Sequence, residues 1–212
     1  MRRYWIGCFL VVITGCVALL SVALAASNFV PIKLLHGVQV ELPRNWKALS
    51  SNQRITLDAA VQSRNEPAGI FDASSDLHFG ANYYDDSGKA AASMNIRYYP
   101  DSDISQAEAH AVMQSEVREL DRALRESIVK AGQVNGLSVL RWGGTRKQVI
   151  NGITAFVTEY KRSSQKDSGN FKVRLVRVFD RDKSFTLTVS YREDQEYLLR
   201  PICDRVISSL RK

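Results

Sequence analysis

The chain has 212 residues, 45% of them hydrophobic, and a formal net charge of +7. The part from residue 26 onward has the size of one domain and is long enough to bury a hydrophobic core. Cys203 is the only cysteine in that part, which excludes an intrachain disulfide there, so packing alone must hold the domain together. Because apolar residues surround Cys203, we predict a buried, unreactive thiol.

The first residues have the pattern of an export signal. Arg2 and Arg3 precede an uncharged run over residues 4–26, and the small residues of a signal-peptidase site follow. Ala23 and Ala25 occupy the two small-residue positions of that site, and cleavage after Ala25 would leave Ala26 as the first residue. The sequence therefore predicts an exported, periplasmic protein.

We divide the chain into a signal segment, residues 1–25, and one α/β domain, residues 26–212. Two alternatives to cleavage stay open. The uncharged run is about as long as a membrane span, so it could be retained as an anchor that gives the protein contact with the membrane. Ile13-Thr14-Gly15-Cys16 has the form of a lipoprotein box, which would place a lipid on Cys16.

Basic residues are concentrated in one part of the domain. Residues 141–183 contain eleven basic and four acidic residues, whereas residues 26–140 contain eleven and fourteen. A basic segment of this kind indicates an anionic partner, such as an acidic protein face, an acidic polymer or a lipid headgroup surface. Strand faces that are merely solvated are the alternative. Nucleic acid is not expected, because the protein carries an export signal and no nucleic-acid-binding motif.

The first half of the domain alternates between strand-like and helix-like patterns. The expected elements are a strand at residues 38–42, a helix at 51–64, a loop at 65–75 and a hairpin at 76–99. Pro43 is expected to end the first strand because proline cannot donate to a ladder. The longest helix is predicted over Ser105–Lys130, with a capping box from Ser105 to Glu108 and a stop at Gly132.

Three turn signals follow, and Asn151-Gly152 is the strongest of them. They separate four expected strands, at residues 137–150, 152–163, 170–180 and 183–191, which together predict an antiparallel meander. A closing helix is expected over residues 193–210, with a kink at Pro201. This order of elements predicts an α+β fold in which helices flank the faces of one largely antiparallel sheet.

Some stretches resemble a known family. These stretches are LLHGVQVELPRNW at residues 34–46, the strand Phe185–Tyr191, Leu199-Arg200-Pro201 and Val206–Leu210. Together with the order of elements, they resemble the PsbP-like α/β/α sandwich family over about residues 30–210, with bacterial envelope members of the DcrB type as the nearest branch. Members of this family tend to dock on larger assemblies and are mostly not enzymes, so the resemblance implies an accessory role.

The sequence shows no catalytic or metal-binding motif. His36, His78 and His110 are not at ligand spacing, and we expect each to be a surface or packing residue. A nucleophile elbow and a phosphate-binding loop are both absent from the sequence. Gly143-Gly144 lies inside a strand pattern and suggests a bulge or a close approach of another backbone segment. We therefore predict no cofactor, no metal and no enzymatic activity.

Acidic pairs near residues 72–76, 85–86 and 101–103 are expected to serve turns and caps rather than a cation. Four tyrosines occur as two adjacent pairs, Tyr83-Tyr84 and Tyr98-Tyr99. We expect them to pack under helices on both faces of the sheet, with an exposed aromatic patch as the alternative.

The sequence thus predicts an exported, non-enzymatic accessory domain that docks on an envelope protein or an anionic surface. The expected contact is a basic strand face formed by Arg146, Lys147, Lys161, Arg162, Lys172, Arg174 and Arg177. One alternative is a periplasmic small-ligand-binding protein with a cavity between the sheet and the long helix. Another is a hydrolase whose site the sequence does not reveal.

Overall fold

The computed structural model describes residues 28–212, except residues 66–74, 101, 103, 165–168 and 182. The predicted cleavage site at Ala23, Ala25 and Ala26 and the alternative lipid site at Cys16 lie outside the described residues. Most of the loop expected at residues 65–75 does so too. Within the described parts of the chain, no helix is both long and apolar enough to cross a membrane.

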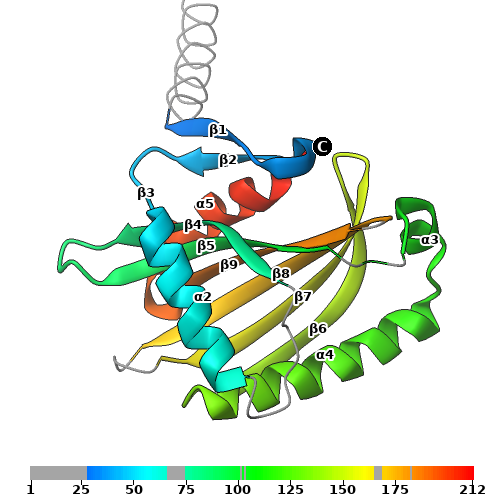
Figure 1. The fold of residues 1–212 in the computed structure, drawn as a ribbon. Coiled ribbons are helices and arrows are strands. Elements are labelled where there is room, and N and C mark those ends of the chain that lie inside the picture. Colours follow the sequence, from blue (N-terminus) through cyan, green and yellow to red (C-terminus); the bar gives the residue numbers. More distant parts are fainter. Residues whose placement is uncertain (1–27, 66–74, 101, 103, 165–168, 182) are drawn as a thin grey trace, which may run out of the picture.

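The centre of the fold is a seven-stranded antiparallel sheet in the order β3-β4-β5-β9-β8-β7-β6 (Figure 1). Its strands are β3 Lys47–Ala48, β4 Asp76–Tyr84, β5 Ala90–Tyr99, β6 Val139–Ile150, β7 Ile153–Ser163, β8 Asn170–Asp180 and β9 Lys183–Arg192. The helices are α2 Ser51–Asn65, α3 Gln106–Ala111, α4 Gln114–Val134 and α5 Glu196–Ser208, with short 3-10 turns at Leu35–Gly37 and Glu193–Gln195. The predicted α+β fold, including the hairpin β4–β5 and the meander β6–β9, is confirmed.

Helices cover both faces of this sheet because its strands alternate between two sets of side chains. On one face, Leu187 and Val189 of β9 pack against Leu199 and Val206 of α5 in the main core. On the other face, Phe156 of β7 belongs to a smaller cluster with residues of α3, α4 and β8. Helix α5 therefore lies on the face opposite to α3 and α4.

The described part of the domain starts with a strand that the sequence analysis missed. β1, Phe29–Lys33, pairs with β2, Gln39–Pro43, and the two form a separate sheet instead of joining the large one. This small sheet is attached to the end of α5, because the backbone N–H of Glu41 donates to Ser209 Oγ at 2.7 Å. The side chain of Glu41 also forms an ion pair with Arg205 of α5 at 3.0 Å.

The single long helix expected over Ser105–Lys130 is wrong, because two helices, α3 and α4, cover this region. The capping box from Ser105 to Glu108 is confirmed at the start of α3. A second start follows at Met113, whose N–H donates to the Glu116 carboxylate at 2.6 Å. Lys147 Nζ from β6 donates to the carbonyl oxygens of His110 and Val112 at 2.6 and 2.7 Å, which stabilises the end of α3.

Helix α4 also continues past Gly132 to Val134, so the predicted stop was wrong. The left-handed residue comes later, at Gly136, which has a φ of 66°. At the other predicted glycine position, the bulge is confirmed. The register of β6 against β7 shifts between Trp142 and Gly144, and a Cβ on Gly143 would lie 2.9 Å from the backbone oxygen of Glu159.

The turn between β6 and β7 is the one that the Asn151-Gly152 pair predicts. Both residues have a positive φ, 49° and 83°, which asparagine and glycine tolerate best. The Asn151 side-chain amide donates to the carbonyl oxygens of Ser208 and Leu210 at 2.7 and 2.9 Å. These bonds attach the tip of the β6–β7 hairpin to the end of α5, and so they fix the walls of the site described next.

Candidate functional site

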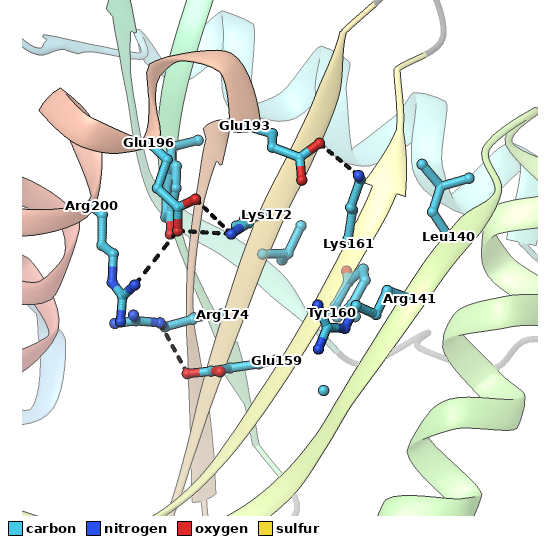
Figure 2. Close-up of a pocket in the computed structure, with 13 residues that line it drawn as sticks. Leu140, Arg141, Glu159, Tyr160, Lys161, Lys172, Arg174, Glu193, Glu196 and Arg200 are labelled. Atoms are coloured by element: carbon cyan, nitrogen blue, oxygen red, sulfur yellow. Dashed lines mark hydrogen bonds and ion pairs between the residues drawn. The ribbon is translucent and has the colours of Figure 1, made fainter.

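A hollow of about 540 Å³ lies between α5 and strands β6–β9 (Figure 2). A second hollow of about 560 Å³ lies toward the β6–β7 turn and shares Glu159, Arg174 and Arg200 with the first. We call the two together the polar groove, because six cationic and four anionic residues line it. They are Arg141, Arg146, Glu159, Lys161, Lys172, Arg174, Glu193, Glu196, Arg200 and Asp204.

The groove forms where a strand face changes from apolar to charged. Val157 of β7 and Val176 of β8 are buried in the main core near α5. Two residues further from the core on the same face, these strands carry Glu159 and Arg174, which lie directly opposite each other in the register. Helix α5 places Glu196, Arg200 and Asp204 at intervals of four residues, so that they line the groove as one helical row.

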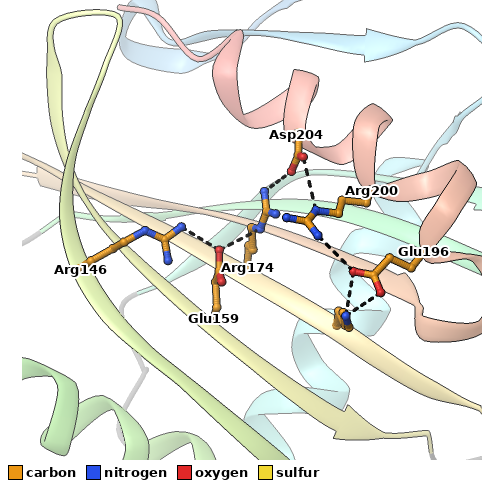
Figure 3. Close-up of polar contacts among 7 residues, drawn as sticks. Arg146, Glu159, Arg174, Glu196, Arg200 and Asp204 are labelled. Carbon is orange, nitrogen blue, oxygen red and sulfur yellow. Dashed lines mark hydrogen bonds and ion pairs between the residues drawn. The ribbon is translucent and has the colours of Figure 1, made fainter.

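Arg174 is the centre of an ion-pair network on the floor of the groove (Figure 3). It contacts the carboxylate of Glu159 at 3.1 Å and forms a close hydrogen bond with Asp204 of α5. Glu159 also accepts from Arg146 of β6 at 2.8 Å, and Asp204 lies 3.8 Å from Arg200. The network therefore links three strands to α5 through side chains alone.

The network continues along α5 toward the start of the helix (Figure 2). Arg200 lies 3.6 Å from Glu196, which accepts from Lys172 of β8 at 2.7 Å. Next to this pair, Lys161 of β7 contacts Glu193 at 2.6 Å. All four carboxylates that line the groove thus have a cationic neighbour within 4 Å.

These cations keep the carboxylates ionised. The hydrogen bond from Arg146 lowers the pKa of Glu159, and the bonds from Lys172 and Lys161 lower the pKa values of Glu196 and Glu193 in the same way. A general acid at neutral pH needs the opposite shift, toward a raised pKa. These three carboxylates are therefore unsuited to act as general acids at neutral pH.

The nearby thiol is unsuited to catalysis as well. Cys203 is buried, as predicted, and burial raises the pKa of its thiol to about 12. A thiol in that state is rarely ionised at neutral pH and is a poor nucleophile.

The seven cations predicted to share one basic face are divided between the two faces of the sheet. Arg146, Lys161, Lys172 and Arg174 line the polar groove. The prediction of one shared basic face was wrong because successive side chains of a strand point to opposite faces. Lys147 follows Arg146 and Arg162 follows Lys161, so both lie on the face opposite to the groove. Whether any of these cations meets an anionic partner stays a prediction.

The three cations on the far face have structural contacts. Lys147 bonds the end of α3, as described above. The guanidinium of Arg162 lies 5.0 Å from the ring centroid of Phe171. That of Arg177 lies 5.1 and 5.3 Å from the rings of Tyr99 and Phe179. In such cation–π contacts, the guanidinium is attracted to aromatic rings of the same chain and so stabilises the fold.

Sequence reasoning missed two arginines on the rim of the groove. Arg200 projects from α5 with its side chain 57% exposed, and Arg141 is exposed on β6. Arg141 has no ion-pair partner among the described residues. A usable signal was present for Arg200, since Glu196 and Asp204 flank it at four-residue intervals on a predicted helix. For Arg141, the signal was its place as the first residue of the basic segment 141–183.

The histidines do not form a site together. His36 and His78 each make an edge-on contact with the buried Tyr98, both at 5.3 Å between ring centroids. His110 lies elsewhere, with Nδ1 3.3 Å from Thr154 Oγ1. Among the described residues, no group of three or more histidine, cysteine, aspartate or glutamate side chains could hold a metal ion.

The adjacent tyrosines lie in different environments. Tyr98 belongs to the main core and Tyr83 packs against it, whereas Tyr84 is exposed beside Lys47.

The cavity for a small ligand was expected between the sheet and the long helix. The two hollows of the groove and a third one at the end of α5 all lie away from α4, and no residue of α4 lines any of the three.

Comparison with solved structures defines the class of fold. The chain matches the solution structure of cyanobacterial PsbP from Synechocystis sp. PCC 6803 with a TM-score of 0.54 and 12% identity, covering 87% of this chain and 92% of that one. No protein-family model matches the chain, and no curated protein does so. The chain therefore has the PsbP-like fold that its sequence resembles.

Two other solved structures are similar at a lower level. LpqN of Mycobacterium tuberculosis, described as involved in cell envelope biogenesis, gives a TM-score of 0.42 with 12% identity over 86% of this chain and 88% of that one. The Ran-binding protein Mog1p of Saccharomyces cerevisiae gives 0.43 with 9% identity over 87% and 95%.

Proposed function

We propose that the chain is an exported, non-enzymatic accessory domain that binds an anionic protein partner of the cell envelope through the rim of the polar groove. One observation carries the proposal: three arginines, Arg141, Arg146 and Arg200, surround the groove with exposed side chains. Export is supported by the charged start, apolar run and small-residue site in the first 26 residues.

Two of the rim arginines are held in place by the network beneath them. Arg146 bonds Glu159 while 51% of its side chain stays exposed, and Arg200 lies between Glu196 and Asp204. A guanidinium presents several donors in a planar fork that matches a carboxylate. Side chains that are already positioned lose less entropy on binding, so the network favours recognition of acidic side chains.

The interior cations are poor probes of this function. Reversing the charge of Lys172 or Arg174 would remove ion pairs that hold β8 to α5. Reversing Arg177 would remove its contacts with the rings of Tyr99 and Phe179 on the other face of the sheet. The informative change is the rim variant Arg141→Glu/Arg146→Glu/Arg200→Glu. A control variant with the same change in net charge is Arg122→Glu/Arg125→Glu/Lys130→Glu, which alters exposed residues of α4 on the opposite face.

Both variants should be compared with the unmodified chain in cross-linking and recovery from envelope fractions at low and raised salt. We expect the control variant to recover the same proteins as the unmodified chain, and the rim variant to lose those whose recovery depends on salt. Equal recovery by the rim and control variants would contradict the proposal.

A further inference from the structure

Next to the rim lies an open edge of the sheet. β6 is the last strand in the strand order and pairs with β7 alone among the described strands (Figure 1). An edge strand presents a row of backbone N–H and C=O groups that can pair with another strand. The bulge at Gly143 interrupts the first part of β6, but the register from Thr145 to Ile150 is continuous. Within this part, residues 146–149 are exposed, and Val149 keeps 55% of its surface.

We propose that residues 145–150 of β6 accept an extended acidic segment of the partner protein as an additional strand. This inference rests on the proposed function, because it specifies how the anionic partner binds beside the groove. In strand addition, backbone hydrogen bonds supply affinity and alternate side chains supply specificity.

The charge of β6 determines what kind of strand fits. The twelve residues of β6 include Arg141, Arg146 and Lys147 and no acidic residue. Opposite charges on facing strand positions stabilise a pair, and like charges destabilise it. A second copy of this chain would bring together two strands that carry only cations, so charge disfavours self-pairing and favours an acidic segment.

The alternation of side chains predicts the pattern of that segment. Arg146 points toward the groove and Lys147 toward the opposite face, so acidic residues are expected at two consecutive positions of the added strand. Val149 lies on the same face as Lys147, two residues further along β6. An apolar residue is therefore expected two positions from the acidic residue that faces Lys147.

The edge is also held rigid, which lowers the cost of pairing with it. Asn151 attaches the hairpin tip to the end of α5, and Lys147 Nζ binds the end of α3, as described above. At the start of this segment, Thr145 Oγ1 lies 2.9 Å from Thr158 Oγ1 on β7. Residues 145–150 are thus fixed by both neighbouring helices and by the adjacent strand.

A peptide probe tests the inference with the full chain in a neutral detergent. The probe has the sequence TVTEETVT with blocked ends, and the matched control is TVTKKTVT. We expect the acidic peptide to bind at low salt, to slow amide hydrogen exchange in residues 145–150, and to bind more weakly to the rim variant. The lysine peptide should not bind. An acidic peptide that fails to bind, or that leaves these amides unprotected, would overturn strand addition.

Backbone pairing is separated from charge attraction by two N-methylated forms of the acidic peptide. One form carries methyl groups on the odd residues and the other on the even residues, so each blocks the hydrogen bonds of one strand edge. Strand addition predicts that one form loses about tenfold in affinity while the other binds like the parent. If both bind like the parent, strand addition is wrong, whereas the proposed binding of an anionic partner at the rim still holds. If recovery from envelope fractions is also unaffected by the rim variant, the proposed function fails independently.

Discussion

Replacing Arg174 with methionine separates the structural role of the groove network from its exposed rim. The Arg174 side chain is 19% exposed and contacts both Glu159 and Asp204. Methionine retains an unbranched apolar stem but removes the guanidinium. Each carboxylate keeps a second arginine, Arg146 or Arg200, so the loss should lie near the lower end of the range for hydrogen bonds between charged groups. We expect the free energy of unfolding to fall by about 2 kcal/mol.

The control is Arg200→Met, because the exposed side chain of Arg200 makes only longer ion pairs, at 3.6 and 3.8 Å. Exposed pairs of this kind contribute less than about 1 kcal/mol. Urea unfolding at neutral pH, followed by circular dichroism, measures both variants. In thermal unfolding, Arg174→Met should lower Tm by about 4–8 °C. Equal losses in the two variants would refute the assignment of Arg174 to the structural floor and Arg200 to the rim.

Three further predictions concern the turn, the thiol and the carboxylates. Asn151→Gly should lower the free energy of unfolding by about 1–2 kcal/mol, because two hydrogen bonds are lost. Asn151→Ala should lower it by about 1 kcal/mol more, because alanine tolerates the positive φ poorly. Equal urea midpoints for the two variants would contradict this. With the two N-terminal cysteines replaced by serine, Cys203 should react with a thiol reagent only after unfolding, because burial raises its pKa to about 12; rapid labelling of the folded protein would disprove this. The pKa of Glu159 is lowered by the hydrogen bond from Arg146, so the folded state binds fewer protons than the unfolded state. The stability from this pair should be complete above about pH 5 and fall toward pH 3, and Arg146→Met should flatten that pH dependence.

Local signals in the sequence were sufficient for most of the elements. Asn151-Gly152 predicted the β6–β7 turn because two successive residues need a positive φ there. Ser105 and Glu108 predicted the start of α3 because their side chains and backbone groups bond reciprocally. Alternation along Phe185–Tyr191 placed its four large side chains in the core.

The errors arose where a distant residue decides a local structure. β1 contains Pro31 and pairs with β2 alone among the strands that the structure describes, so its sequence alone gives a weak strand signal. The apolar period continues through Val112 and Met113, but Lys147 from β6 binds the carbonyl of Val112 where α3 ends. A periodicity argument cannot include a contact from a strand that follows 35 residues later.

The sequence by itself determined most of the elements and the α+β class, because turns, caps and apolar periods act over a few residues, and its first residues have the pattern of an export signal. It also contained the information that Arg146 and Lys147 face opposite ways, since a strand has a period of two. Only the tertiary structure decided the composition of the polar groove. Glu159 and Arg174 face each other because β7 and β8 are paired, and Asp204 reaches them because α5 packs over this face of the sheet. The position of α5 on the sheet depends on the packing of the whole core, which no local pattern encodes.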